Sequence, residues 1–427
     1  MGDTPVADEF DVVIAGGGLV GGSLAIALAQ IKAQTNCRVA LIESVPPESD
    51  AQPSFDDRTI ALSRGSYRIL RQLGIWSHIQ VSVWPIQKIH VSQQQHFGTS
   101  VIDAIEQGVA ELGYVINSRV LGEALWEQIR ALPDVTVFCP TSVTATEIDR
   151  EYEDGRCRVE LQGADGTQSI TTRLLVAADG ARSQVRTALG ISAEDRDYKQ
   201  VAVVAKVQID AEYVGHVAYE RFTKEGPLAM LPGPDGQYTV VLARNVETVQ
   251  SVMDMSDEAL LTLLQSLFGF RLGRLRRLGK RQAYPLHLVT AGEIMAERSV
   301  IIGNAANGLH PVAAQGFNLG LRDVASLAEI IADGLRNDMP GQGQKFDPGA
   351  KETLQAYADW RQRDQRRVVK FTDGLIRLFG VQGGAAAAAR GLSLAAFDVL
   401  PGAKKELARQ TMGLAGKMSR LARGLPL

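Results

Sequence analysis

Hydrophobic residues recur along the chain with two different spacings, which together predict an α/β protein. Short apolar runs such as "VVIA" (12–15) and "LLVAA" (174–178) are typical of buried parallel strands, and "SLAIALAQI" after the first run has helical spacing. Between residues 200 and 245, four short β-rich runs are separated by Gly, Pro and Asp: "QVAVVAKVQI", "HVAYERF", "LAMLPG" and "QYTVVLAR". These runs predict an antiparallel sheet, and "DEALLTLLQSLFG" after them predicts a helix.

The C-terminal part is predicted to be helical, because apolar residues recur three and four positions apart with Lys and Arg between them. From Arg361 to Leu427, 13 Lys or Arg stand against 4 Asp or Glu, a local charge of +9 in a chain whose total is −3. This basic region indicates either a contact with a membrane surface or a partner, or a helical face that packs on the rest of the protein. The balanced total charge gives no case for nucleic-acid binding.

Composition limits the class of protein. The 427 residues, 45% of them hydrophobic, are enough for two or three domains with a large core. Three widely spaced cysteines, Cys37, Cys139 and Cys157, form no disulfide framework and fit a reducing compartment. The start "MGDTPVADEF" has no apolar signal segment, and no uncharged run is long enough to span a bilayer. We therefore expect a cytoplasmic protein, either free or peripheral to the inner membrane.

A glycine-rich turn directly follows the first predicted strand. Gly16, Gly18 and Gly21 fit the pattern G-x-G-x-x-G, and a helix and a second strand ending in Glu43 follow. The first glycine allows the turn, the second lets backbone N–H groups approach a pyrophosphate, and the third lets helix and strand pack closely. Glu43 can accept both ribose hydroxyls of an adenosine and disfavours a 2′-phosphate. The motif thus predicts FAD or NAD at this site.

Two later segments carry further candidate residues. The strand Leu174–Ala178 ends in Asp179-Gly180, which by itself is a common turn. The stretch "GNAANGLHPVAAQGFNLGLRD" (303–323) connects the apolar run "RSVIIG" to a predicted helix, and it is longer than such a connection needs.

These two segments resemble the second and third fingerprints of the class A flavoprotein monooxygenases. The resemblance implies that Asp179 lies near the flavin chain, that Gly303 and Asn304 meet the ribityl group, and that Pro311 and Gly316 pass the flavin ring. It also implies that the helix starting near Asn318 directs its N-terminus at the N1/C2=O edge of the ring. Asn304 stands where the family usually has an acid. Its amide can still accept a hydrogen bond, without the charge.

The resemblance narrows to the ubiquinone-biosynthesis hydroxylases, which are polyprenyl-phenol FAD monooxygenases. It extends over essentially the whole chain in the same order, through "FDDRTIALSRGSYRILRQLGIW", "YVINSRVLGEAL", "YERFTKEGPLAMLP", "LHPVAAQGFNLGLRD" and "MGLAGKMSRLARGLPL". The fold implied is a Rossmann-like FAD-binding domain of the para-hydroxybenzoate-hydroxylase type with an antiparallel substrate domain. We assign the FAD-binding domain to 1–78, 111–190 and 291–360, the substrate domain to 79–110 and 191–290, and a helical region to 361–427.

Three side chains keep two interpretations each. The resemblance makes Arg58 and Asn117 cofactor-binding candidates, but Arg58 could form a surface ion pair and Asn117 could cap the helix "SRVLGEALWEQI". His310 is the only histidine inside a cofactor motif. With Pro311 it is the catalytic candidate, through proton transfer near neutral pH, or else it holds a His-Pro turn.

The chemistry that the resemblance implies belongs to a cofactor. None of the six histidines forms an H-x-x-x-H or H-x-x-E-H pair, so we predict no metal site, and there is no G-x-S-x-G elbow. The resemblance implies that NAD(P)H, bound transiently, reduces FAD, and that O₂ then gives a flavin C4a-hydroperoxide that hydroxylates a polyprenyl phenol in ubiquinone biosynthesis. A hydroxylase of another phenol and a non-catalytic flavin-binding scaffold of a biosynthetic complex are the alternatives.

Overall fold

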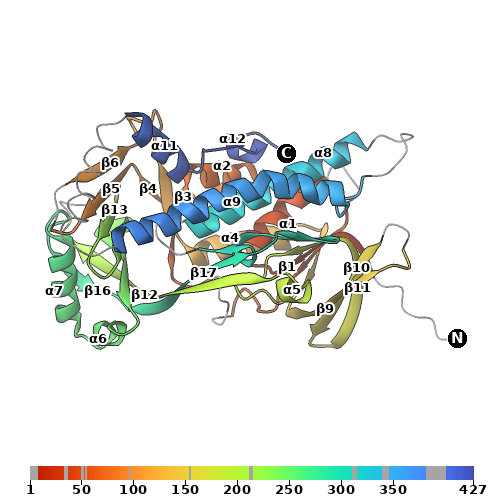
Figure 1. Cartoon of the computed structure of the whole chain (residues 1–427), viewed down its shortest axis with the longest axis horizontal. Coiled ribbons are helices and arrows are strands. Elements are labelled where there is room, and N and C mark those ends of the chain that lie inside the picture. The colour runs from red at the N-terminus through yellow and green to blue at the C-terminus, as the bar shows by residue number, and fades with distance from the viewer. Residues whose placement is uncertain are drawn as a thin grey trace.

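The computed structural model describes residues 8–32, 37–49, 52, 55–95, 98–152, 155–210, 215–309, 315–338, 346–380 and 401–427. The molecule is elongated, with a parallel sheet toward one end and a larger, mainly antiparallel sheet toward the other (Figure 1). A long helix, α9 (Lys351–Gly380), runs alongside both parts. The predicted α/β architecture with a helical C-terminal part is confirmed.

The parallel sheet has the strand order β19 (Ser299–Ile301), β11 (Gly166–Ala177), β1 (Asp8–Ala15), β2 (Val39–Ile42) and β8 (Val135–Phe138). Val12, Val13 and Ile14 are all fully buried, because β1 lies in the middle of the sheet with both faces covered. Ala15 at the end of β1 pairs with Ala177 on one side and Ile42 on the other. The carboxyl ends of these three strands therefore meet at one edge.

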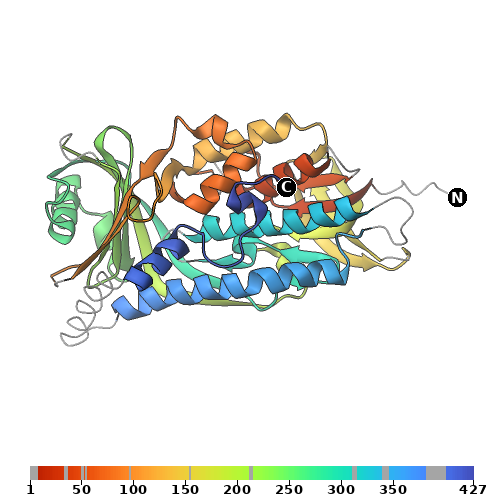
Figure 2. The same cartoon turned by 90° about the horizontal axis from the view of Figure 1, so that it is seen from above.

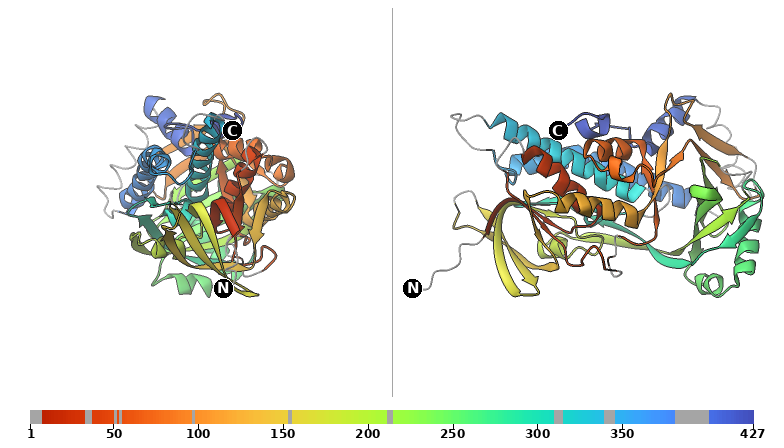
Figure 3. Two further views of the ribbon diagram at one scale, coloured as in Figure 1. Left: turned by 90° about the vertical axis from the view of Figure 1, so that its right-hand side faces the viewer. Right: turned by 180° about the vertical axis from the view of Figure 1, so that it is seen from behind.

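Helices cover one face of this sheet. α1 (Leu19–Lys32) packs between α4 (Ser118–Arg130) and α8 (Gln315–Asn337), as Figure 3 shows from two sides. β18 (Met295–Ala296) pairs antiparallel with β19, and β9 (Thr141–Asp149) and β10 (Arg156–Gly163) extend the sheet through β11. The short helix α5 (Gln184–Ala188) follows β11.

The second sheet has the order β20 (Asn307–Gly308), β17 (Gln282–Ala291), β12 (Ala193–Ile209), β15 (Gln237–Asn245), β14 (Pro227–Pro232), β13 (Val217–Phe222), β5 (Lys88–Gln93) and β6 (Thr99–Asp103), with β16 (Leu275–Leu278) beside β12. The predicted antiparallel pairing of β12, β13, β14 and β15 is confirmed, and β5, which was not among the predicted runs, pairs parallel with β13. α6 (Val249–Met253) and α7 (Asp257–Phe268) lie at this end of the molecule, and α7 packs its apolar side chains on one face of the sheet. The opposite face of the sheet borders a cavity.

A three-stranded sheet joins the two parts: β3 (Thr59–Ser63), β7 (Gly113–Asn117) and β4 (Trp84–Ile86). α2 (Arg64–Gln72) and α3 (Trp76–Ile79) follow β3. The loop strand β20 lies within the segment assigned to the FAD-binding domain but pairs with β17 of the antiparallel sheet. The domain limits themselves stay a prediction.

The C-terminal helices lie against the body of the protein. α9 and α8 lie side by side (Figure 2), while α12 (Arg420–Arg423) packs on α2 and α11 (Pro401–Thr411) packs beside β6. Within the described part of the chain, none of the helices combines the length and the apolar character needed to cross a membrane.

Candidate functional site

A cavity of about 830 Å³ begins at the carboxyl ends of β1, β2 and β11 and reaches the open face of the antiparallel sheet. Ligands of open parallel sheets bind at this edge, where the loops after the strands diverge. Of the predicted cofactor-binding residues, seven line the cavity: Gly16, Gly18, Glu43, Arg58, Asp179, Asn304 and Gly316.

The first glycine turn has the geometry that its sequence predicts. Gly16 has a φ of +107°, and a Cβ there would lie 2.6 Å from the carbonyl oxygen of Ala178. Gly21 does not face the cavity; its missing Cβ lets α1 approach, since a Cβ would lie only 1.9 Å from the carbonyl oxygen of Gly16. Only glycine fits either position, so the turn holds α1 with its N-terminus at the cavity.

Glu43 is positioned by hydrogen bonds to both of its oxygens. Oε2 accepts from the backbone N–H of Gly17 (2.7 Å) and Oε1 from that of Val45 (2.8 Å). Oε1 also accepts from the hydroxyl of Ser44 (3.4 Å), whereas Oε2 keeps a second lone pair, so the buried side chain can still accept from a hydroxyl in the cavity. The indole of Trp126 donates to the carbonyl oxygen of Gly17 (3.0 Å) and fixes the same turn. Trp126 was not predicted from the sequence, because its contact with the turn spans 109 positions.

Asp179 offers a test of whether a ligand rich in hydroxyl groups fits. Its Oδ2 accepts from the backbone N–H of Val185 at the start of α5 (3.2 Å). Its Oδ1 is buried and has no hydrogen-bond partner among the described residues. A buried oxygen without a donor is costly, and a hydroxyl from a ligand in the cavity would satisfy it. Arg182 and Gln184 after it also line the cavity.

The connection from β19 to α8 meets the cavity through Asn304 and Gly316. Asn304 is exposed, and its Oδ1 lies 3.8 Å from the position that a Cβ on Gly316 would take, so the two residues are adjacent. Gly303 does not line the cavity; its φ of +60° turns the chain, and its N–H donates to Oδ2 of Asp323 (3.1 Å). The catalytic candidates His310 and Pro311 lie outside the described residues.

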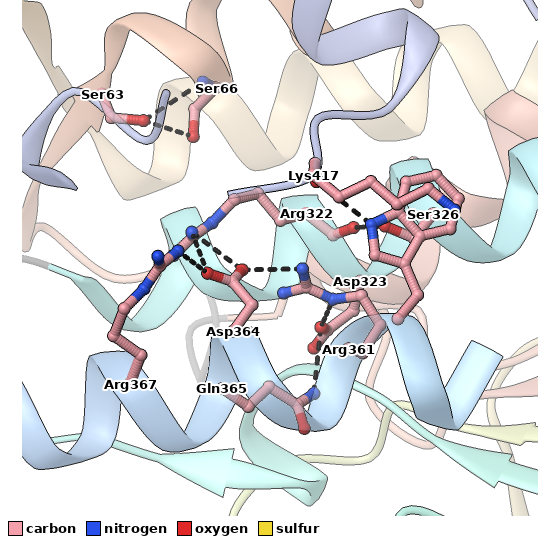
Figure 4. Close-up of polar contacts among 11 residues, drawn as sticks. Ser63, Ser66, Arg322, Asp323, Ser326, Arg361, Asp364, Gln365, Arg367 and Lys417 are labelled. Atoms are coloured by element: carbon pink, nitrogen blue, oxygen red, sulfur yellow. Dashed lines mark hydrogen bonds and ion pairs between the residues drawn. The ribbon is translucent and has the colours of Figure 1, made fainter. Parts of the chain in front are cut away.

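Asp323 belongs to a buried ionic network between α8 and α9 (Figure 4). Its Oδ1 accepts from Nε of Arg361 (2.7 Å) and from Nε2 of Gln365 (3.0 Å). Arg361 also donates to Asp364, which pairs with Arg322 (2.9 Å). Burial opposes the charge of Arg361, but Asp323 and Asp364 outweigh it and raise the pKa of its guanidinium. The network thus connects the turn at Gly303 to helix α9.

Two predicted residues have structural contacts and do not line the cavity. Asn318 is buried, accepts from the N–H of Ser63 (2.8 Å) and the hydroxyl of Ser66 (2.6 Å), and donates to the carbonyl of Ala61 (2.8 Å). Asn117 accepts from the N–H of Arg119 (2.8 Å), which is the helix cap considered as its alternative. For both, a contact with a cofactor stays a prediction.

Arg58 lines the cavity beside the antiparallel sheet. Its guanidinium forms an ion pair with Asp56 (2.5 Å) and lies over the ring of Tyr284, 5.0 Å from the ring centre. The structure thus places Arg58 at the cavity and in an ion pair, so the two interpretations of this residue are compatible.

The antiparallel sheet presents small apolar side chains to the cavity. Its lining residues are Ala202, Ala218, Ala229, Leu231, Val241, Ala243 and Leu286, with Pro227 at the edge. Glu220 on β13 also lines the cavity on this face of the sheet, where the other lining side chains named above are apolar. Glu220 was not predicted as a site residue, although the alternation in "HVAYERF" puts it on one side of the strand with Ala218.

Comparisons with known proteins agree with this geometry. A family model described as "FAD binding domain" matches residues 9–372. The ubiquinone hydroxylase UbiL of Rhodospirillum rubrum is 35% identical over 99% of this chain and 95% of its own length. The 3-demethoxyubiquinol 3-hydroxylase of Escherichia coli is 32% identical over 76% of this chain and 80% of its own. In fold, the chain is similar to p-nitrophenol 4-monooxygenase PnpA of Pseudomonas putida, with a TM-score of 0.75 at 19% identity, covering 96% and 99% of the two chains.

Proposed function

The chain belongs to the FAD-binding-domain family of flavoprotein hydroxylases, and from this premise we propose that it hydroxylates the aromatic ring of a polyprenyl phenol in ubiquinone biosynthesis. The observation that carries this proposal is the continuity of the cavity. One space joins the glycine turn and Glu43, which suit a dinucleotide, to an apolar sheet face that suits a lipophilic ring.

FAD, when bound, supplies the redox chemistry by carrying electrons from NAD(P)H to O₂. The turn at Gly16 and Gly18 and the N-terminus of α1 would hold its pyrophosphate, and Glu43 its adenosine ribose. Asp179 would accept from a hydroxyl through its unpartnered Oδ1, and Asn304 from another. Gly316, on the first turn of α8, leaves room for a flat ring beside the helix N-terminus, which favours negative charge there.

Four assignments in this proposal rest on the resemblance. They are contacts of Arg58 and Asn117 with the cofactor and roles for His310 and Pro311 beside the reacting ring. The observed contacts of Asn318 give it a positioning role. Its hydrogen bonds to β3 and α2 hold the start of α8 in place.

The test is turnover by the purified protein. We expect it to bind FAD, and to oxidise NADH or NADPH in the presence of a polyprenyl phenol and O₂ with one oxygen atom added to the ring, detected by mass spectrometry. Deletion of the gene should make the host accumulate a ring-unhydroxylated quinone precursor. A protein that binds FAD but adds oxygen to no prenylated phenol, in a host that makes ubiquinone normally without a second hydroxylase, would contradict the proposal.

We also propose that the protein contacts a membrane surface or a biosynthetic complex through its basic C-terminal region. Arg363, Arg366 and Lys370 are exposed on one face of α9 and support this. Other cations of the region are engaged within the chain: Lys404 pairs with Glu106 (2.9 Å), and the ammonium of Lys417 lies over Trp360. Replacing Arg363, Arg366 and Lys370 with glutamine should reduce co-sedimentation with vesicles containing anionic lipid. Equal sedimentation would remove this face from consideration.

A further inference from the structure

Glu220 places a carboxyl group in an otherwise uncharged wall of the cavity. It lies on β13, where it pairs with Ala229 of β14 and Val91 of β5. Among the described residues that the strands of the antiparallel sheet and the three-stranded sheet contribute to the cavity lining, Glu220 is the one with an ionisable carboxyl group. Its side chain is on the same face of β13 as Ala218, and both residues line the cavity that a substrate ring would fill.

The carboxyl has no partner to neutralise it within the described structure. Its Oε1 is inaccessible to solvent and has no hydrogen-bond partner there, although the residue as a whole is only partly buried. On the same strand, Tyr219 also touches the cavity, but its ring and the guanidinium of Arg221 are engaged with α7. The ring of Tyr219 packs edge-on against Phe268, 5.2 Å between centres, and Nε of Arg221 donates to the carbonyl of Leu267 (2.7 Å).

The charged and titratable groups on neighbouring strands are also engaged elsewhere. On β5, Lys88 pairs with Asp103 (3.0 Å) and His90 stacks near Tyr219. β14 has no titratable residue. The other groups on the sheet have the following partners: Tyr238 of β15 packs near Tyr219, Arg244 of β15 donates to Ala243, and on β17 Tyr284 contacts Arg58 and Asp56 and His287 contacts Asp195. The remaining charged side chains lining the cavity are Glu43, Arg58, Asp179 and Arg182.

Burial therefore determines the protonation of Glu220. It raises the pKa of the carboxyl to about 7, so the group exchanges a proton near neutral pH. Packing gives no reason for such a residue, because a buried carboxyl without a partner costs stability and an apolar side chain would suit this wall better. Groups of this kind are concentrated where a proton must be moved.

We propose that Glu220 is the general base that accepts the proton of the substrate's phenolic hydroxyl. This inference rests on the proposed function. The phenolic O–H bond breaks, its proton moves to the carboxylate of Glu220, and its electron pair stays on the ring oxygen. Electron density rises at the ring carbons ortho and para to that oxygen, which favours attack by one of them on electrophilic oxygen.

The remaining proton balance closes on the same residue. As the new C–O bond forms, the O–O bond of the oxidant breaks and leaves its second oxygen atom as an anion. The hydroxylated carbon then loses its hydrogen as a proton, which passes through water to that anion, and the ring becomes aromatic again. Glu220 returns its proton to the phenolate oxygen, so the residue ends as it began. A base whose pKa lies near the working pH is the most effective for such a transfer.

The test compares Glu220→Gln with Glu247→Gln in the FAD-loaded protein. Glu247 is exposed on the loop after β15, so it matches the chemical change at a site away from the cavity. With 2-geranylphenol as probe, hydroxylated product is measured from pH 6 to pH 10. We expect Glu220→Gln to lower kcat roughly 100-fold at pH 7 and Glu247→Gln to change it less than twofold.

The pH profile separates a base from a residue that only shapes the cavity. The deficit of Glu220→Gln should shrink toward pH 10, where the phenol ionises without help, and it should shrink at pH 7 for ring-fluorinated probes of lower pKa. A deficit that is equal at every pH and for every probe, or a rate within twofold of wild type at pH 7, would overturn the inference while leaving the proposed function standing. A wild-type protein that hydroxylates no phenol would remove both.

Discussion

Single side chains decide how well this site binds its cofactor. Asn304 lines the cavity next to Gly316, at the position where the family resemblance implies an acid. Asn304→Asp keeps the shape and adds a charge, and a charged oxygen accepts hydrogen bonds from ribityl hydroxyls more strongly than an amide does. We expect FAD to bind about fivefold more tightly, a gain of about 1 kcal/mol, measured by fluorescence titration of the apoprotein. Weaker binding would show that the amide is the fitted group.

The raised pKa of Glu220 predicts a pH dependence of stability that needs no turnover. The unfolded chain loses this proton near its ordinary pKa of 4.5, whereas the folded chain keeps it up to about 7. Stability should therefore fall as the pH rises from 4.5 to 7 and stay lowered above it, by at most about 3 kcal/mol from this group. In urea unfolding, the free energy of unfolding of Glu220→Gln should rise relative to that of wild type at pH 8 but not at pH 4.5. Equal differences at both values would refute the shift.

At the scale of helices and strands, the junction of α8 with α9 depends on Asp323. This residue is fully buried and holds Arg361, Gln365 and the N–H of Gly303. Asp323→Asn leaves the buried guanidinium of Arg361 without one of its two carboxylates. Breaking a buried pair from one side costs about 3–5 kcal/mol, which should appear in the free energy of unfolding.

The control for this loss is Asp359→Asn, an exposed acid on α9, the helix that carries Arg361, whose Oδ1 accepts from Gln355 (2.9 Å). It should change stability by less than about 0.5 kcal/mol. We also expect Asp323→Asn to weaken FAD binding, because the turn at Gly303 loses a charged acceptor. Unchanged stability would mean that the network in Figure 4 contributes nothing to the junction.

Elements set by local pattern could be predicted, and contacts between distant segments could not. The run Val12–Ala15, the turn at Gly16 and the acid Glu43 follow one another within 32 positions, so their order identifies the site. Asn318 lies 255 positions from Ser63, and only the folded arrangement turns its side chain toward α2. Glu220 was missed for a similar reason. Alternation places it on one face of a strand, but only the packing of the two sheets makes that face a cavity wall.

Across the whole molecule, the C-terminal segment braces the same region. The N–H of Gly65 on α2 donates to the carbonyl of Met412 (2.8 Å), and Gln72 donates to the carbonyl of Gly424 (2.9 Å). α2 in turn holds Asn318 through Ser66 (2.6 Å). The C-terminal segment is thus connected through α2 to the start of α8, which lines the cavity.

Gly65→Ala tests this connection. A Cβ at residue 65 would lie 2.8 Å from the carbonyl oxygen of Gly413, so α2 and the C-terminal segment must move apart, at a cost of about 1–3 kcal/mol. Trypsin should then cleave faster after Lys417, and FAD affinity should fall because α2 no longer holds Asn318 firmly. The matched change Gly374→Ala meets no atom within 4 Å on helix α9 and should raise stability by up to about 1 kcal/mol. If both variants resist trypsin as wild type does, the C-terminal segment does not depend on the close approach at Gly65, and its influence on the cavity is refuted.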